Sequence, residues 1–165
     1  MIRIVSGQEI LGLGEHVVRC PEGTLAALGL GSCIAVILHD PEAQVGAMAH
    51  VVLPSQSLSK VRDRPGRFPE TAVPLLLTEM KAQGAQLARV TARLVGGASM
   101  FGSLVPAGTM HMGQRNVMAC RAAVRVAGLQ VFAESVGGER GRSVWFDVAS
   151  GLVTVRSVGD EPVQL

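Results

Sequence analysis

Cys33 and His50 are the two side chains in this sequence whose types and spacing best suit chemistry. Cys33 directly follows a glycine-rich turn, Gly29–Ser32, and begins an apolar run. Backbone N–H groups exposed in such a turn can lower the pKa of a thiol and can bind an oxyanion. His50 lies in the next apolar run, and a turn at Asp40–Gln44 would fold that run back beside the first. The two side chains could therefore be a nucleophile and its base.

The cysteines and His50 also have a purely structural interpretation. Cys33 can pack as a small hydrophobic side chain, and His50 can be a core histidine with satisfied hydrogen bonds. Cys120 falls on the apolar stripe of a predicted helix, and Cys20 ends a predicted strand before Pro21, so a core role is expected for both. Three scattered cysteines without a CxxC pair indicate a reducing compartment rather than a disulfide framework.

Composition and motifs exclude several other functions. The net charge is +2 and aromatic residues make up 3% of the chain, which argues against a nucleic-acid binder. "GLGEH" and "GLGSC" lack the third glycine of a dinucleotide fingerprint, and the four histidines lack zinc-ligand spacing. We therefore expect no cofactor and no metal. No signal peptide or run long enough to span a bilayer is present, so we expect a soluble, cytoplasmic protein.

The apolar patterning predicts one domain, residues 1–165, of the α/β class and α+β type. Mixed or antiparallel sheet layers should have helices packed against them. A long surface loop is expected over 55–70, and helices over 71–83, with Leu75, Leu76, Leu77 and Met80 on its apolar face, and over 113–127. Pro74 should fall in the first turn of the first helix. Strands are expected over 16–20, 24–30, 33–40, 45–54, 87–97, 129–135, 142–149 and 151–157.

Five ordered sequence blocks resemble a known family. "LGLGSCIAVILHDP", "VGAMAHVVLP", "VGGASMF", "MGQRN" and "ESVGGERGRSVWF" are similar to the CheD family, the chemoreceptor glutamine deamidases of bacterial chemotaxis. The resemblance covers about residues 8–158. It implies a fold similar to the catalytic domain of cytotoxic necrotising toxins, with a Cys–His active centre. It also implies deamidation of glutamines on receptor signalling helices, and in some members hydrolysis of glutamate methyl esters.

Carried over by position, the resemblance makes Cys33 the nucleophile and His50 the general base and acid. The backbone N–H groups around Gly31, Ser32 and Cys33 are our expected oxyanion hole. Two positions depart from the family pattern. Ala27 stands where the family usually has a threonine, so a hydroxyl that could orient His50 is absent, and Ser135 stands where an aspartate is common. We do not expect Thr24 to replace the missing hydroxyl, because a residue three positions away on a strand faces the other side.

The resemblance also implies partners. The cytoplasmic helices of chemoreceptors would be the substrate, and a CheC-type phosphatase would be a second partner. Residues 95–101 and the basic loop over 55–70 are candidate contact surfaces. The alternatives are a protein that mainly binds and regulates such a phosphatase, and a structural domain without enzymatic activity.

Overall fold

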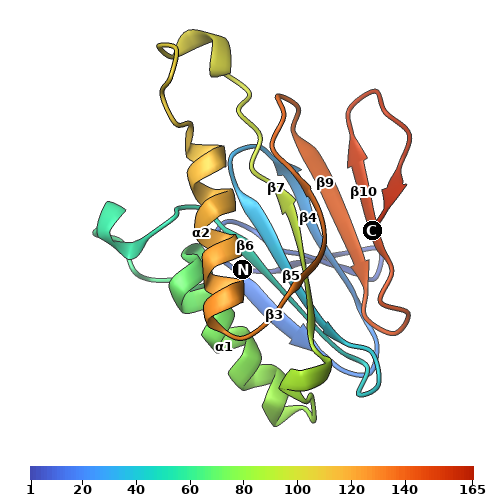
Figure 1. The fold of residues 1–165 in the computed structure, drawn as a ribbon. Helices are drawn as coiled ribbons and strands as arrows, with labels where there is room; N and C mark the ends of the chain where they lie inside the picture. The colour runs from blue at the N-terminus through green and yellow to red at the C-terminus, as the bar shows by residue number, and fades with distance from the viewer.

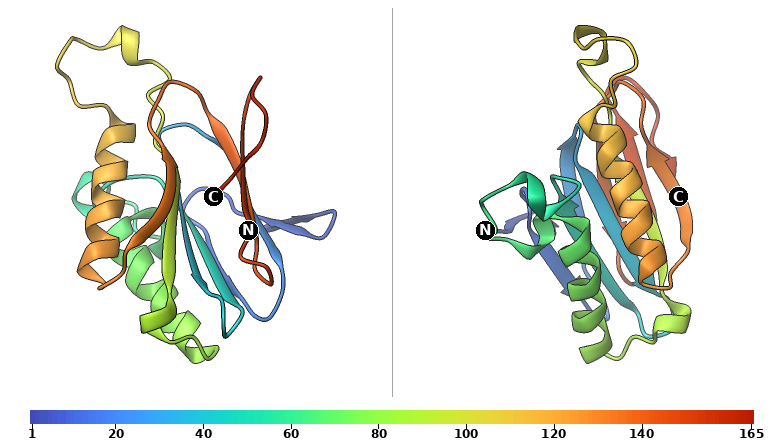
Figure 2. Two further views of the ribbon diagram at one scale, coloured as in Figure 1. Left: turned by 45° about the vertical axis from the view of Figure 1, so that its right-hand side comes forward. Right: turned by 60° about the vertical axis from the view of Figure 1, so that its left-hand side comes forward.

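Residues 1–165 form one α+β domain with three layers in the computed structural model. Two α-helices cover one face of a five-stranded central sheet, and a six-stranded outer sheet covers its other face (Figures 1 and 2). The strand order is β3-β6-β5-β7-β8 in the central sheet and β1-β2-β4-β9-β10-β11 in the outer sheet. The strands are β1 (Arg3–Val5), β2 (Gln8–Ile10), β3 (His16–Arg19), β4 (Thr24–Leu30), β5 (Ile34–Asp40), β6 (Val45–Val51), β7 (Thr91–Gly96), β8 (Val131–Val136), β9 (Arg142–Asp147), β10 (Val153–Ser157) and β11 (Val163–Gln164).

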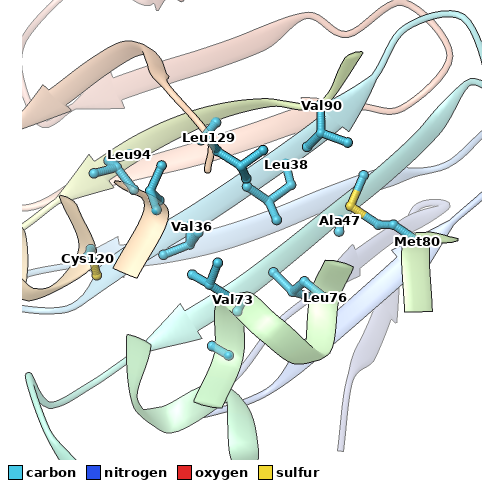
Figure 3. Close-up of a cluster of buried hydrophobic side chains, with 14 of the residues drawn as sticks. Val36, Leu38, Ala47, Val73, Leu76, Met80, Val90, Leu94, Cys120 and Leu129 are labelled. Atoms are coloured by element: carbon cyan, nitrogen blue, oxygen red, sulfur yellow. The ribbon is translucent and has the colours of Figure 1, made fainter. Parts of the chain in front are cut away.

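The hairpin of β5 and β6 is the centre of the fold. All seven residues of each strand are buried, because one face of the hairpin packs on the helices and the other on the outer sheet. Ile34, Val36 and Leu38 belong to the helix-side cluster, whereas Ala35 and Ile37 belong to the inter-sheet cluster. Figure 3 shows the helix-side cluster, in which Val36 and Leu38 lie among side chains of both helices. The period of two along a strand explains this division.

The turn between β5 and β6 is confirmed, and a buried carboxylate holds it. Asp40 is fully buried and accepts the backbone N–H groups of Glu42 and Ala43, each at 3.1 Å. It also accepts the Arg89 guanidinium, with Nη2 at 2.9 Å. Burial alone would raise the pKa of Asp40, but these donors and the Gln86 N–H lower it to about 2. This turn sets the register that brings His50 opposite Ala35.

The two helices are α1 (Pro69–Ala82) and α2 (Met112–Val126), close to their predicted ranges. The buried face of α1 is only partly as expected, since it uses Ala72, Val73, Leu76 and Met80, while Leu75 and Leu77 are half-buried. Pro74 lies inside α1 rather than in its first turn. The reason is that the helix begins earlier, at Pro69, whose fixed φ suits a first helical position.

Several other elements differ from the sequence-based expectation. Strands β1, β2 and β11 were not predicted, and the sheet layers are two separate mixed sheets, with parallel pairs β2–β4 and β7–β8. The expected loop over 55–70 contains two short 3-10 helices, η1 (Gln56–Leu58) and η2 (Pro65–Arg67). A third, η3 (Leu87–Arg89), delays the start of β7, and η4 (Gly102–Leu104) lies in the protruding loop between β7 and α2 (Figure 1). Neither α-helix has the length and apolar character that crossing a membrane requires.

Candidate active site

Cys33 lies on the connection that carries the chain from the outer sheet into the central sheet. The Gly31–Cys33 segment joins β4 to β5, and the Cys33 side chain packs against the inter-sheet cluster while staying partly exposed. All three carbonyls of this segment are held at 2.8 Å. Gly31 O accepts from the Ala98 N–H, Ser32 O accepts from Asn116 Nδ2, and Cys33 O accepts from the Gly97 N–H. Burial raises the pKa of the Cys33 thiol, so the resting side chain is protonated near pH 7.

His50 shares a face of the central sheet with Cys33. It pairs with Ala35 across β5 and β6, and cross-strand partners point to the same face. Cys33 precedes Ala35 by two positions and packs in the same inter-sheet cluster. The structure thus brings the two predicted residues to one end and one face of the hairpin. The His50 ring makes no hydrogen bond to Cys33 Sγ here, a gap that substrate-free sites often show.

The hydrogen bonding of His50 defines which ring nitrogen can act as a base. Nδ1 lies 3.1 Å from the carbonyl oxygen of Leu11. Because a carbonyl only accepts, Nδ1 carries the proton and Nε2 carries the free lone pair. Nε2 is buried and has no hydrogen-bond partner. Burial lowers the pKa of His50, although the Leu11 carbonyl and the nearby Glu15 carboxylate act in the opposite direction. The ring is therefore neutral near pH 7.

The segment from Leu11 to Glu15 holds both the ring and the backbone of His50. The His50 N–H donates to Glu15 O and its carbonyl accepts the Gly14 N–H, each at 2.9 Å. Glu15 is buried, and its carboxylate accepts the Gly12 N–H at 2.6 Å. The Leu11 N–H donates to Ala26 O on β4 at 2.8 Å. His50 is thus fixed from the outer sheet as well as from its own strand.

Ala27 is fully buried on β4 and belongs to the inter-sheet cluster that Cys33 packs against. Its methyl group offers no hydrogen bond to the histidine, whose Nδ1 lies against the Leu11 carbonyl. Thr24 lies at the start of β4, where it pairs with Gln8 and Asp147.

Ser135 accepts a hydrogen bond from Arg142 Nη1 at 3.1 Å. The Arg142 guanidinium also donates to the carbonyl of Gly137 and makes no ion pair. Burial lowers the pKa of Arg142. Without a carboxylate at position 135, this half-buried cation relies on neutral oxygens, so the departure at Ser135 affects the β8–β9 turn rather than the Cys–His pair.

The remaining cysteines and histidines lie elsewhere. Cys120 is buried within α2, where burial raises the pKa of its thiol, and Cys20 directs Sγ to the Ala43 carbonyl at 3.6 Å. His16 contacts Glu79, His39 contacts the Val148 carbonyl, and His111 is the N-cap residue of α2. No cluster of three His, Cys, Asp or Glu side chains could hold a metal ion.

Sequence reasoning missed Asn116. This residue of α2 is fully buried, and its amide joins Ser32 to Val52. The available signal was a polar residue on the apolar stripe of the second helix, four positions before Cys120.

The glycine at the end of β7 sets how closely the chain approaches the nucleophile. Gly96 has φ of +120°, and a Cβ there would lie 2.2 Å from the Cys33 carbonyl oxygen. We expect Gly96→Ala to lower the free energy of unfolding by at least about 3 kcal/mol, from backbone strain and the clash together. Gly84→Ala is the matched control, because its φ is +97° and its Cβ would meet nothing; it should cost about 1–2 kcal/mol. Urea unfolding measures both, and equal losses would refute a tight contact at Cys33.

The fold and this pair of side chains define an α+β protein with the groups that a cysteine-dependent hydrolase requires. Comparison with known proteins gives the family. The model described as CheD chemotactic sensory transduction matches residues 52–157. A relative from Thermotoga maritima, named chemoreceptor glutamine deamidase CheD, is 43% identical over 92% of this chain and 93% of its own. A relative from Geobacter metallireducens, named probable chemoreceptor glutamine deamidase CheD 2, is 36% identical over 99% of both chains.

The chain belongs to the CheD family. The family model begins after Cys33 and His50, but the Thermotoga alignment, at 92% of the chain, spans both.

Proposed function

We propose that this protein deamidates glutamine side chains on the cytoplasmic helices of chemoreceptors, through a covalent intermediate on Cys33. The observation that carries the proposal is the pairing of a partly exposed thiol with a buried, neutral histidine on one face of the hairpin. The names of the relatives, chemoreceptor glutamine deamidases, support the substrate. The place of action would then be the cytoplasm.

The chemistry follows from the protonation states. Nε2 of His50 takes the proton from the Cys33 thiol as Sγ attacks the side-chain carbonyl carbon of glutamine. The free N–H groups of Ser32 and Cys33 stabilise the oxyanion. The protonated Nε2 then gives its proton to the departing nitrogen, so ammonia leaves and a thioester remains. Nε2 next takes a proton from water, and the resulting hydroxide attacks the thioester. The C–S bond breaks, glutamate is released, and Nε2 returns the proton to Sγ, which restores the thiol.

The same steps would hydrolyse a glutamate methyl ester, with methanol as the leaving group in place of ammonia. A methylesterase activity is therefore included in the proposal, with the same two side chains. The Leu11 carbonyl supports a working site despite Ala27, because the orientation of His50 does not depend on a hydroxyl at position 27.

A second candidate role is binding of a CheC-type phosphatase. Part of the expected 95–101 surface is wrong, since Val95 and Ala98 are buried, but Met100, Phe101 and Leu104 are exposed on the protruding loop, Phe101 by 72%. Contiguous exposed apolar side chains favour a protein interaction. Substitution of Phe101 with Glu should weaken phosphatase binding, and this surface does not require a working thiol.

Mass spectrometry of purified receptor cytoplasmic fragments tests the proposed activity. Incubation with the protein should raise the fragment mass by roughly one dalton per converted site, the difference between an amide and an acid. The same reaction in water enriched in ¹⁸O should add roughly two daltons more per site, because the new oxygen comes from water. Peptide mapping would identify the glutamines. No mass change across several receptors, with folded protein, would refute the deamidase and favour the phosphatase-binding role.

A further inference from the structure

Asn116 joins the two chain segments that carry the proposed nucleophile and base. Its Nδ2 donates to Ser32 O at 2.8 Å and to Val52 O at 3.0 Å. Ser32 is the residue before Cys33, and Val52 follows His50 by two positions. We propose that Asn116 is a positioning residue that aligns Cys33 with His50 and orients the oxyanion hole; this inference rests on the proposed function.

The contact to Ser32 determines where the N–H of Cys33 points. In a trans peptide the carbonyl of one residue and the N–H of the next point in opposite directions. With the Ser32 carbonyl held by Asn116, the Cys33 N–H faces away from α2. The Ala98 N–H holds the Gly31 carbonyl in the same manner, which directs the Ser32 N–H. Neither the Ser32 nor the Cys33 N–H donates to any protein group, so both are free for an oxyanion.

Helix α2 can approach the Gly31–Cys33 segment closely because the residue one turn before Asn116 is a glycine, Gly113. A Cβ at Gly113 would lie 2.5 Å from Gly97 O and 2.6 Å from Ala98 O. The first turn of α2 therefore rests directly on the segment that holds the Gly31 and Cys33 carbonyls. From this position the short amide side chain reaches both Ser32 and Val52.

The chemistry of the site favours an amide over an apolar side chain at position 116. Two carbonyl oxygens converge on one point, and Nδ2 offers one N–H to each. The other end of the amide, Oδ1, is buried without a partner, which costs stability. An apolar side chain would avoid that cost on a core stripe that includes Val117 and Cys120. The two donated hydrogen bonds are what such a side chain could not supply.

Asn116→Asp and Asn116→Ala test the positioning role. The aspartate keeps the shape but loses both N–H donors, and the alanine removes the group without adding charge. We expect kcat to fall about 100-fold in each variant, with KM changed less than about threefold. The substitution would displace the reacting groups, whereas the surface that binds the receptor helix would stay in place. The rate of Cys33 alkylation by iodoacetamide, followed by peptide mass spectrometry, should also change, and this measurement needs no receptor.

The matched control is Val124→Ala on the same helix. Val124 is buried, but it lies near the other end of α2, far from the Gly31–Cys33 segment. This variant should therefore lose stability and keep its kcat per folded molecule. If folded Asn116→Ala keeps kcat within about threefold of wild type while Cys33→Ala is inactive, the positioning role is wrong and the proposed function stands. If Cys33→Ala is active, both are wrong. If Val124→Ala lowers kcat as much as Asn116→Ala does, the effect is general destabilisation and the positioning role is again wrong.

Discussion

Cys33→Ala should abolish glutamine deamidation, lowering kcat by about 10⁴-fold or more, while the protein stays folded. The large effect is expected because the thioester cannot form without Sγ, and no other thiol can replace it. Cys120 is buried in the helix-side cluster, and Cys20 packs against the same cluster, on the opposite face of the central sheet. The fold should tolerate the change because Cys33 is partly exposed and its Sγ makes no hydrogen bond. Receptor-fragment mass measures activity, and thermal unfolding measures the fold.

Cys20→Ala and Cys120→Ala are the controls for Cys33. Each removes a thiol from the helix-side cluster, and Cys120→Ala should lower stability by about 1–2 kcal/mol because it leaves a buried cavity. Both should retain the kcat of the wild type per folded molecule. Cys33→Ala should also keep its binding of a CheC-type phosphatase, since that contact is proposed to use the protruding loop. Deamidation at the wild-type rate by Cys33→Ala would rule out the thioester mechanism.

The relative position of Cys33 and His50 was predictable because it depends on local features. Two seven-residue apolar runs flank a turn that begins with Asp-Pro, and this pattern defines a hairpin. Once Asp40 lies opposite Val45, the register places Ala35 opposite His50. The same argument could not say what covers each face of the hairpin. A continuous apolar run indicates burial on both faces, without distinguishing helices from a second sheet.

The outer sheet was harder to predict because its edges carry little hydrophobic signal. All three residues of β1 and both residues of β11 are exposed. β1 and β11 pair with β2 and β10, which lie close to them in the sequence. The short, exposed runs of β1 and β11 carry no alternating apolar pattern that would reveal this pairing. The division of the strands between two sheets depends on tertiary packing.

The supports of the active site depend on tertiary contacts even more strongly. The Leu11 carbonyl that orients His50 is a backbone group, so no side-chain type marks it. Asn116 is separated from Ser32 by 84 positions, and only the close approach of α2 to Gly97 brings them together. Backbone acceptors and long-range bridges of this kind explain why a sequence can indicate the reacting side chains but not the groups that align them.

His50→Gln should lower kcat about 10²–10⁴-fold at pH 7, because it removes the group that accepts and returns the proton. Glutamine is similar in length to histidine, stays polar and cannot act as a base, so the loss of kcat per folded molecule should come from chemistry rather than from the fold. His39→Gln is the matched control. His39 is also a buried histidine of the central sheet whose pKa is lowered by burial, but it contacts Val148 at the other end of β5. It should lose stability and keep its kcat per folded molecule.

The dependence of the rate on pH distinguishes a base from a merely structural histidine. Since burial lowers the pKa of His50 below its ordinary value of 6.5, the wild-type ring stays neutral at pH 7, and activity should fall only when the pH drops through that lowered pKa. The thiol has a raised pKa, so His50→Gln must wait for thiolate that forms without a base. Its residual rate should rise about tenfold per pH unit between pH 7 and 9, while the wild-type rate stays nearly level. If both proteins gave parallel pH profiles, the proton would leave Cys33 by another route, and His50 would be a structural residue of the hairpin.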